Sequence, residues 1–589
     1  MNDFTESIKT IYNFIETSDS KKEKLKLIEK YRVKFKIARE EYLSQKYYEL
    51  TGINKRNGVV YTPGQISLYM IKNLIKPEDV INNPFVKIMD PACGCGNIIF
   101  SCFCYLRHIF IENIQTINEM NNINLKPEDI NAHIVHNNLF GFDIDEIALK
   151  ILSIDLFLLS GEFSKKNFIL KDFLIESVEE KFHLFIGNPP YIGHKSIERS
   201  YSKILKQIYG SIYKDKSDVS YCFFQKSLKC LEEPGKLAFV TSRYFCEACS
   251  GKELRNFLSS NTTIYKIVDF YGIRPFKGVG IDPVIIFLEN RKNCNNKIEI
   301  IRPKKSERKA ESKFYDFLFF KKDKIRYKNF FIAQDSINDS GWVFISEFEK
   351  NIIHKIEKKC QVTLNDICES YQGIITGCDK AFIINKDTLI KKKIELELVR
   401  PWIKNSYIHK NNIIGDEKFI IYSNFIEDEN KYPNSIEYIS KYKEKLVKRR
   451  ECRNGVRKWY ELQWGRKAEV FEGEKIIFPY KSPNNRFALD RGSYFSADIY
   501  SLVLKNNSSM TYSTLLSILN SSLYEFYFKT FGKKLGHNLY EYYPNNVMKL
   551  YIPFIIFSKE YNEEEQLYSY FQLTSREIQY LKNNVDSVT

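Results

Sequence analysis

Short apolar runs alternate with segments of helical periodicity over the first half of the chain. The apolar runs predict strands, and apolar residues spaced three or four positions apart predict helices between them. The predicted strands lie at residues 86–89, 139–143, 168–174, 182–186, 236–241, 265–270 and 284–288, and the predicted helices at 66–75, 98–110, 146–159, 219–231 and 251–259. This alternation is typical of a doubly wound α/β domain, which we place at residues 51–295.

The flanking regions have a different pattern. Residues 1–50 are expected to form an N-terminal helical arm, with apolar residues such as Ile8, Ile11 and Ile15 on one face, and this arm either packs on the core or lies on DNA. Residues 296–360 are lysine-rich and irregular, which predicts a linker or bridging segment. Residues 361–589 mix short strands and helices, which predicts a second, mixed α+β domain.

The charge balance points to a polyanionic partner. The 589 residues include 89 Lys and Arg against 73 Asp and Glu, a net charge of +16. A basic excess favours nucleic acid over a membrane surface, although a lysine-rich surface from an AT-biased genome is the simpler alternative. No apolar run approaches the ~18 residues that a membrane crossing needs, so we expect no membrane association.

The cysteines indicate a reducing compartment. There are 13 of them, an odd number scattered through a long chain, and no secretory signal is evident at the N-terminus, so we expect a cytoplasmic, nucleoid-associated bacterial protein. Four of them could suggest zinc: Cys93, Cys95, Cys102 and Cys104. However, one pair falls in a turn and the other on a helix at positions that face apart, so we expect no metal site.

A glycine-rich turn, Asp90-Pro-Ala-Cys-Gly-Cys-Gly96, joins the first predicted strand to a helix. Glycine allows a sharp turn and the close approach of a ligand to the backbone. Acidic residues follow two later strands: Asp143 is suited to hold ribose hydroxyls and Asp172 to accept a hydrogen bond from an adenine amino group. The simpler alternative is that Asp143 or Asp145 only caps the next helix.

The stretch Asn188-Pro-Pro-Tyr191 follows another apolar strand and suggests methyl transfer to an amino group. The lone pair of an exocyclic amine is delocalised into its ring, so catalysis has to restore it. The side-chain oxygen of Asn188 and the carbonyl of Pro189 could each accept one N–H, which positions the nitrogen without a general base. Pro189 and Pro190 stiffen the turn, and Tyr191 offers a ring for stacking.

Taken in this order, the motifs resemble those of the γ-class N6-adenine DNA methyltransferases, which depend on S-adenosylmethionine and carry a C-terminal target-recognition domain. The resemblance implies a Rossmann-like methyltransferase domain in which Asn188, Pro189, Pro190 and Tyr191 hold a flipped adenine. A second aromatic residue would cover that base, and Phe223, Phe276 and Phe287 are the candidates. The implied cofactor-binding residues are Tyr61, Thr62, Pro63, Asp90, Pro91, Ala92, Cys93, Gly94, Gly96, Asp143, Ile144, Asp172, Phe173 and Asn188.

Basic and aromatic residues are interleaved in three C-terminal stretches, at 371–382, 449–466 and 480–487. Arg reads guanine and clamps phosphate, Asn and Gln pair with adenine, and Trp and Tyr stack on bases. The alternative is a surface ion-pair cluster with core aromatics. The predicted DNA-binding residues are Arg453, Arg457, Lys458, Trp459, Tyr460, Gln463, Trp464, Arg466, Lys481, Asn484 and Arg486.

The predicted function is sequence-specific methylation of adenine N6 in double-stranded DNA. The first two C-terminal stretches look specifically like the orphan, sporulation-associated adenine methyltransferase of clostridia, which implies an A-rich, non-palindromic site methylated on one strand. The segment before Tyr61 is too short for a nuclease domain, so we expect methylation without cleavage by a monomer with no obligatory protein partner. The alternatives are an RNA or protein-glutamine N-methyltransferase and a non-catalytic DNA-binding subunit.

Overall fold

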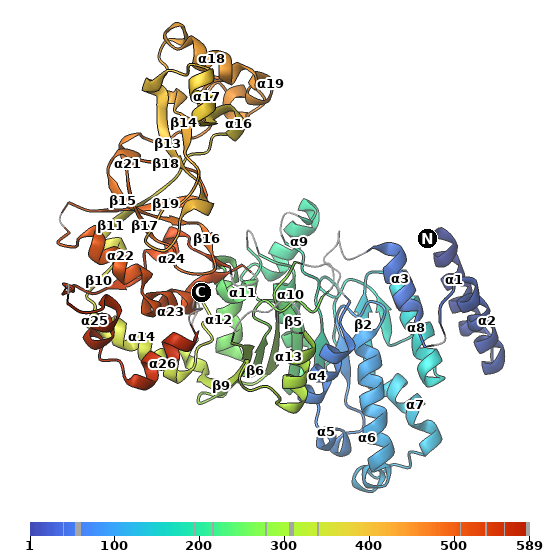
Figure 1. Cartoon of the computed structure of the whole chain (residues 1–589). Helices are drawn as coiled ribbons and strands as arrows, with labels where there is room; N and C mark the ends of the chain where they lie inside the picture. The colour runs from blue at the N-terminus through green and yellow to red at the C-terminus, as the bar shows by residue number, and fades with distance from the viewer. Residues whose placement is uncertain are drawn as a thin grey trace. The chain divides into compact units, whose positions relative to one another are not determined.

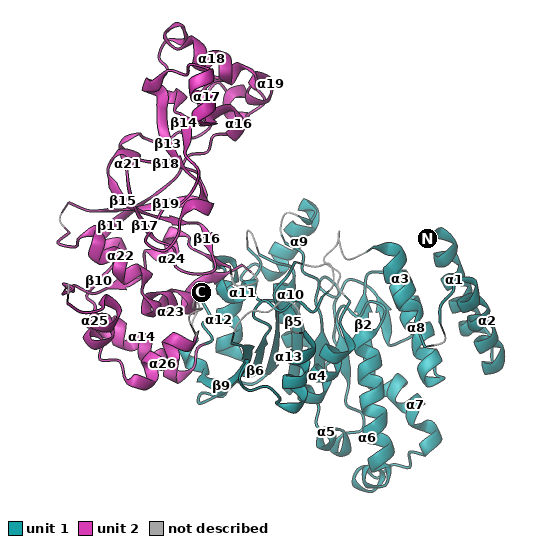
Figure 2. Cartoon of the chain, viewed as in Figure 1, with its two compact units in different colours: residues 1–344 teal, residues 345–589 magenta. Residues whose placement is uncertain are grey.

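The protein is described here by a computed structural model, which covers residues 1–38, 40–52, 61–193, 196–214, 217–276, 280–304, 311–337, 341–506, 508–535, 539–558 and 560–584. The chain forms two compact units, unit 1 (residues 1–344) and unit 2 (residues 345–589), shown in Figures 1 and 2. Among the described residues, no helix is both long and apolar enough to span a membrane.

Unit 1 is built on a nine-stranded sheet with the order β3-β2-β1-β4-β5-β7-β6-β8-β9. Strands β1 to β5 run parallel to one another, β7 is antiparallel to both β5 and β6, and β9 is antiparallel to β8. The strands are β1 (Ile88–Asp90), β2 (Leu139–Asp143), β3 (Phe168–Leu170), β4 (Phe182–Gly187), β5 (Leu231–Ser242), β6 (Thr263–Asp269), β7 (Pro283–Glu289), β8 (Lys297–Pro303) and β9 (Tyr327–Ala333). The predicted doubly wound α/β fold is confirmed.

Helices cover both faces of this sheet, so its central strands are buried on both sides. Alternate residues of β4 enter separate cores: Leu184 and Ile186 belong to one cluster and Phe185 to the other. This burial explains why the strands appear in the sequence as unbroken apolar runs. The principal helices of unit 1 are α1 (Asn2–Thr17), α2 (Lys21–Lys34), α3 (Leu43–Thr51), α4 (Gly64–Leu74), α5 (Pro77–Asn82), α6 (Asn97–Asn121), α8 (Glu146–Ser160), α9 (Arg199–Tyr209), α10 (Ser220–Cys230), α12 (Lys252–Asn261) and α13 (Glu311–Phe320).

The segment predicted as a linker, residues 296–360, is divided differently in the structure. Its first part supplies β8, α13 and β9 to unit 1, and its last part begins unit 2 with α14 (Glu347–Lys359). Ile298, Ile300 and Ile301 of β8 are fully buried, but the lysine-rich sequence around them obscures this short apolar pattern. The linker prediction is therefore wrong for this part of the chain.

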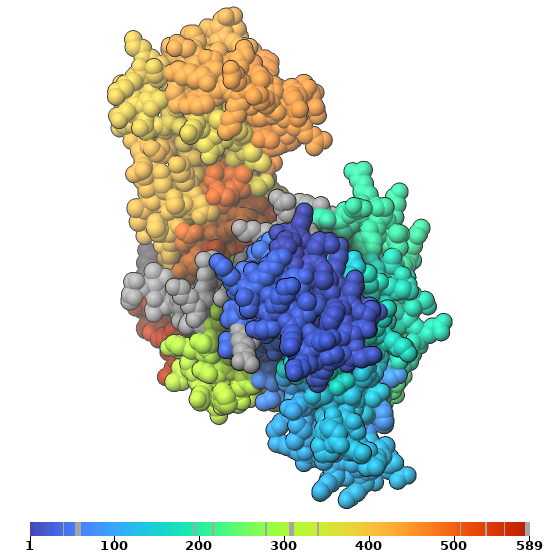
Figure 3. Space-filling model, turned by 90° about the vertical axis from the view of Figure 1, so that its right-hand side faces the viewer, coloured from blue at the N-terminus to red at the C-terminus, as the bar shows by residue number. Residues whose placement is uncertain are grey.

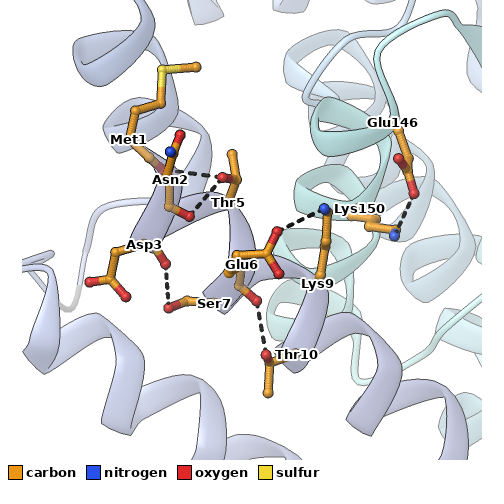
Figure 4. Close-up of polar contacts among 10 residues, drawn as sticks. All are labelled: Met1, Asn2, Asp3, Thr5, Glu6, Ser7, Lys9, Thr10, Glu146 and Lys150. Carbon is orange, nitrogen blue, oxygen red and sulfur yellow. Dashed lines mark hydrogen bonds and ion pairs between the residues drawn. The ribbon is translucent and has the colours of Figure 1, made fainter.

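The N-terminal arm packs on unit 1. The apolar face of α1, including Ile8, Ile11 and Ile15, shares a hydrophobic cluster with Ile151 and Ile154 of α8. At the margin of this contact, Lys9 pairs with Glu6 and Lys150 pairs with Glu146 (Figure 4). The arm, dark blue in Figure 3, forms a continuous surface facing the viewer. Of the two interpretations of its apolar face, packing on the core is confirmed.

Unit 2 contains several small sheets and a helical layer. Its two four-stranded sheets have the orders β11-β19-β15-β17 and β12-β14-β13-β18. Their strands are β11 (Cys368–Gln372), β12 (Ile383–Asn385), β13 (Val399–Ile403), β14 (Lys418–Ile421), β15 (Glu474–Pro479), β17 (Ala488–Arg491), β18 (Tyr494–Phe495) and β19 (Ile499–Leu504). Helices α14, α22 (Tyr512–Asn520) and α23 (Ser522–Phe531) share a core with the first sheet, and α18 (Pro433–Ser440) shares one with the second.

Candidate functional site

The predicted site residues of unit 1 meet at the carboxyl ends of the central parallel strands. The chain passes from β1 outward to β2 and β3 and then returns to β4 on the other side of β1. Such a reversal of strand order opens a crevice for ligands at the carboxyl edge of the sheet. Asp90 ends β1, Asp143 ends β2 and Asn188 directly follows β4.

The glycine-rich turn is held by hydrogen bonds to two of these acids. The Ala92 N–H donates to the Asp90 carboxyl at 3.1 Å, and the Gly94 N–H donates to Asp143 at 2.7 Å. Gly96 has a φ of +89°, and a Cβ there would lie 2.7 Å from Cγ of Leu152 in α8. Both the turn and its approach to α8 therefore depend on glycine.

The acids at the strand ends have distinct roles. Asp145, not Asp143, caps α8, because its carboxylate accepts the N–H groups of Ile147 and Ala148 at 3.0 and 3.1 Å. Asp143 instead bridges to the glycine turn and accepts the Asp145 N–H at 2.8 Å. Burial raises the pKa of Asp143, and it raises the pKa of Asp90 to about 8. Of the two capping alternatives, capping by Asp145 is the one observed.

The Asn188 amide is oriented from both sides. Its Nδ2 donates to the Thr62 hydroxyl at 3.1 Å, and its Oδ1 accepts a hydrogen bond from the hydroxyl of Tyr191. Thr62 is buried directly before α4, and Pro63, rather than Thr62, occupies the N-cap of that helix. The threonine hydroxyl thus serves as an acceptor for the amide, which points the Asn188 oxygen away from Thr62 and toward Tyr191.

Space behind the Asn188 turn is limited. A Cβ on Gly187 would lie 3.0 Å from the Asp90 carboxyl oxygen and 3.2 Å from Pro91. Glycine at the end of β4 therefore allows the turn to lie directly against Asp90. The segment after the turn is also fixed, since the Val219 N–H donates to the Ile192 carbonyl at 3.1 Å.

The three candidate aromatics differ in their surroundings. Phe287 is fully buried within β7 and packs edge-on against Tyr69 of α4, so it offers no surface to a base. Phe223 of α10 stacks on Phe173 at a centroid distance of 6.1 Å. Phe276 is buried and lies in the segment between β6 and β7. Phe173 is also buried, packed against Phe142, Phe185 and Phe223.

Two predicted DNA-binding residues of unit 2 make internal contacts. Tyr460 is fully buried in the core, contrary to the prediction that it contacts DNA. The Arg486 guanidinium donates to the Ser482 hydroxyl, the Ile408 carbonyl and the Asn405 side chain, so it links two segments of unit 2. Each side chain packs between short elements of unit 2. The sequence did not indicate which way either side chain points.

Other predicted residues of unit 2 are accessible, and one of them, Trp464, lies where two of the stretches meet. Ile375 and Trp464 exchange backbone hydrogen bonds, at 2.9 and 3.1 Å, which joins the 371–382 stretch to the 449–466 stretch. Trp464 is 39% exposed, and the Arg466 guanidinium donates to the Gln372 side chain at 2.7 Å. The other accessible or half-buried predicted residues are Arg453, Arg457, Lys458, Trp459, Gln463, Lys481 and Asn484.

Arg449, which the sequence did not single out as a contact residue, fastens this junction. Its guanidinium donates to the carbonyls of Thr376, Trp459 and Glu461 at 2.8–3.1 Å. Gly377 has a φ of +76°, and a Cβ there would lie 2.7 Å from Cδ of Arg449. The feature of the sequence that could have indicated this contact is Gly377, one of two glycines in the 371–382 stretch.

Comparisons with known proteins bear on both units. Residues 160–276 match the Eco57I restriction-modification methylase family, and residues 80–170 match the MmeI DNA-methyltransferase domain. Residues 400–552 match the TaqI-like C-terminal specificity domain. The chain is related to type II restriction–modification methyltransferases. The two methylase matches fall on the sheet of unit 1, and the specificity match falls on unit 2.

Similar proteins cover most of this methyltransferase-like chain. Type II methyltransferase M.BstVI of Geobacillus stearothermophilus is 23% identical over 521 residues, which is 85% of this chain and 90% of the relative. M.HindII of Haemophilus influenzae is 25% identical, covering 90% of this chain and 95% of the relative. The solved structure of the type IIL restriction-modification enzyme MmeI in complex with DNA covers 90% of this chain and 75% of that chain, with 16% identity and a TM-score of 0.57, which establishes the shared fold.

The residues at the strand ends of unit 1 fit S-adenosylmethionine as the cofactor. It is a cation with hydroxyl and amino donors, and Asp90, Asp143 and Asp172 place acceptors at the ends of adjacent strands. Ile144, between two of the acids, is 75% exposed, and an apolar side chain in that position offers a surface for an adenine ring.

No group of three or more metal-ligating side chains occurs in the described parts of the chain, so the four-cysteine zinc alternative has no support there.

Proposed function

We propose that the chain is a sequence-specific DNA methyltransferase that modifies adenine at N6, with S-adenosylmethionine as methyl donor. The observation that carries the proposal is the Asn188 turn. Its amide is fixed by Thr62 and Tyr191, and it lies beside the buried Asp90 at the switch point of the sheet. Relatives that cover most of the chain are type II methyltransferases, which supports DNA as the substrate.

In the proposed reaction, the Asn188 oxygen and the Pro189 carbonyl accept the two amino hydrogens of the target base. Their combined pull favours a tetrahedral nitrogen and directs its lone pair away from the two acceptors. S-adenosylmethionine supplies the electrophilic methyl group on its sulfonium. The proton leaves the nitrogen only after transfer, so the site needs no general base of matched pKa.

The cofactor is assigned to the acids and the glycine turn. Asp143 would accept ribose hydroxyls, Ile144 would lie against the adenine ring, and Asp172 would accept from the adenine amino group. Asp172 already accepts from the Leu174 N–H at 2.9 Å and from the Tyr201 hydroxyl at 2.7 Å, so its carboxylate is held in one orientation. Tyr61, Thr62 and Pro63, with the 90–96 turn, would enclose the methionine part.

The target base is assigned to a position over the Asn188 turn, after it has been flipped from the duplex at a cost of a few kcal/mol. Stacking on aromatic rings, worth ~1–3 kcal/mol per base, offsets part of that cost. Tyr191 supplies one ring and Phe223 or Phe276 the other. The accessible residues around Trp464 and Arg466 are assigned to DNA contact, consistent with the excess of positive charge.

The remaining features of the proposal are predictions from the sequence and from its family resemblance. They are methylation without cleavage, an A-rich non-palindromic site modified on one strand, a monomeric enzyme and a role in sporulation. The stretch Glu472-Gly-Glu-Lys475 resembles the tail of a metal-dependent nuclease motif but lacks a clear preceding Pro-Asp. Its Lys475 is held in a buried ion pair with Asp490 at 2.6 Å. This pairing supports a purely structural role for that stretch.

The test is modification-sensitive sequencing of DNA from cells that express the chain, its Asn188→Ala variant or its Asn261→Ala variant. Asn261 is exposed at the end of α12 and provides the matched control. We expect N6-methyladenine at one short motif with the wild type and with Asn261→Ala, and none with Asn188→Ala. If none of the three proteins modifies DNA, labelled S-adenosylmethionine with RNA and glutamine peptides distinguishes the other methyltransferases from a non-catalytic DNA-binding subunit.

A further inference from the structure

The N-terminal arm contains a helix, α3, that is anchored to unit 1 by a buried carboxylate. Asp155 of α8 is completely buried, and its two oxygens accept the N–H groups of Leu43 and Ser44, both at 3.0 Å. These N–H groups belong to the first turn of α3, where helices have unpaired donors. At the same end of the helix, Tyr42 stacks on Phe100 of α6 at 5.3 Å. The start of α3 is therefore fixed against both α8 and α6.

Two adjacent tyrosines of α3 reach the two loops assigned to the cofactor. The Tyr47 hydroxyl donates to the Asp145 carboxylate at 2.7 Å, in the loop after β2. Because the same carboxylate caps α8, this hydrogen bond fixes both the loop and the first turn of α8.

Tyr48 contacts the other loop, the glycine-rich turn. Its hydroxyl accepts a hydrogen bond from the Asn97 side chain at 3.2 Å, and a Cβ built on Gly94 would lie 3.6 Å from the same oxygen. The Tyr48 ring also packs edge-on against Tyr61 at 5.4 Å. Tyr48 therefore lies among the turn, the start of α6 and one of the residues assigned to the methionine part of the cofactor.

The two loops are themselves joined by the hydrogen bond from Gly94 to Asp143. Cys95 of the turn belongs to the hydrophobic cluster formed by the arm and α8. The arm thus contacts the turn through packing and hydrogen bonds, and the loop after β2 through Tyr47. The charged face of the arm is not needed for any of these contacts.

We infer that helix α3 of the N-terminal arm is part of the cofactor-binding machinery, and that Tyr47 and Tyr48 are positioning residues that hold the two cofactor loops in their binding conformation. The ligand is S-adenosylmethionine, which these tyrosines affect through Asp145, Gly94 and Tyr61. The inference rests on the proposed placement of the cofactor and extends it to residues upstream of the recognised motifs. It does not depend on which substrate is methylated.

The experiment measures the Kd of S-adenosylmethionine for the full chain by isothermal titration calorimetry without DNA. Tyr47→Phe and Tyr48→Phe each remove one hydroxyl and keep the ring. We expect each to raise the Kd about 3- to 10-fold, the range for losing one hydrogen bond that organises a binding loop. Tyr12→Phe is the matched control, since Tyr12 lies on α1 and its ring packs against Phe163, away from both loops; its Kd should stay within about 2-fold.

Thermal unfolding without cofactor separates positioning from a structural role. A purely structural role lowers the melting temperature of Tyr47→Phe and Tyr48→Phe while their Kd stays at the wild-type value, and that result overturns the inference. Weakened DNA binding with an unchanged Kd also overturns it and assigns the arm to DNA. If the wild type binds S-adenosylmethionine but methylates no DNA, the proposed function fails, and the Kd comparison still decides the role of the arm. If the wild type does not bind the cofactor, the proposed function and this inference both fail.

Discussion

We expect Asp90 to make the affinity for the cofactor depend on pH. It is buried at the end of β1, and burial raises its pKa to about 8. At pH 7 the free protein therefore holds this carboxyl mostly protonated, and ionising it costs about 1.4 kcal/mol, the free energy of one pKa unit. S-adenosylmethionine is a cation, and a cation close to Asp90 favours the ionised carboxylate. Binding is then coupled to the release of a proton.

The sign of the effect follows from this coupling. Below the pKa of Asp90 the protein must lose a proton in order to bind, whereas above it the carboxylate is already present. We expect the Kd of S-adenosylmethionine to fall about 10-fold per pH unit between pH 6 and 7 and to level off above pH ~8.5. Isothermal titration calorimetry in two buffers with different ionisation enthalpies measures both the Kd and the number of protons released.

The matched variant is Asp90→Asn, which keeps the shape of the side chain but cannot ionise. Its Kd should vary much less between pH 6 and 9, and any dependence that remains reports the amino group of the cofactor or Asp143, whose pKa is also raised by burial. The reasoning is refuted if the wild-type Kd is constant over this range, or if the variant shows the same slope.

Two further predictions concern the hydrogen bond to Asn188 and the glycine turn. Thr62→Val removes the acceptor for the Asn188 amide and should lower kcat about 10-fold, the equivalent of one lost hydrogen bond. Thr62→Ser keeps the hydroxyl and should retain most activity. If both variants lose the same activity in single-turnover methylation, Thr62 does not act by orienting the amide. Gly96→Ala forces a positive φ on alanine and a 2.7 Å approach to Leu152, so it should lower the free energy of unfolding by about 3 kcal/mol, with Gly473→Ala, where nothing lies within 4 Å of the added Cβ, as the control in chemical denaturation.

Long-range burial explains which parts of the fold were predictable. The apolar run Phe182–Gly187 predicted β4 because both of its faces are buried, and the glycines and acids near it marked the carboxyl edge of the sheet. Strand β8 was missed because its pattern is short and its neighbours are lysine-rich. Pairing with β6, which precedes it in the chain, and burial against distant helices decide its structure.

The site was predicted less completely because some of its residues are far apart in the sequence. Tyr47 contacts Asp145 across 98 positions, and no periodicity or motif in the arm distinguishes it from its neighbours. In unit 2, Tyr460 is buried while nearby Trp464 is 39% exposed, although both lie in the same irregular stretch. Where neither helix nor strand periodicity fixes the direction of side chains, composition predicts a contact surface but not its members.

The hydrogen bond between Tyr191 and Asn188 has a consequence for the choice of base. The Asn188 oxygen can only accept hydrogen bonds from an incoming base. In the proposed reaction, a base that presents an N–H group there donates a hydrogen bond beside the tyrosine hydroxyl or in its place. A base that presents a carbonyl there places two oxygen acceptors against each other. Leaving such buried polar groups without partners costs ~1–3 kcal/mol each. Under the proposed reaction the turn therefore favours bases with an exocyclic amino group, and thymine has none. Adenine, cytosine and guanine each carry one, so the size and stacking of the surrounding pocket must separate those three.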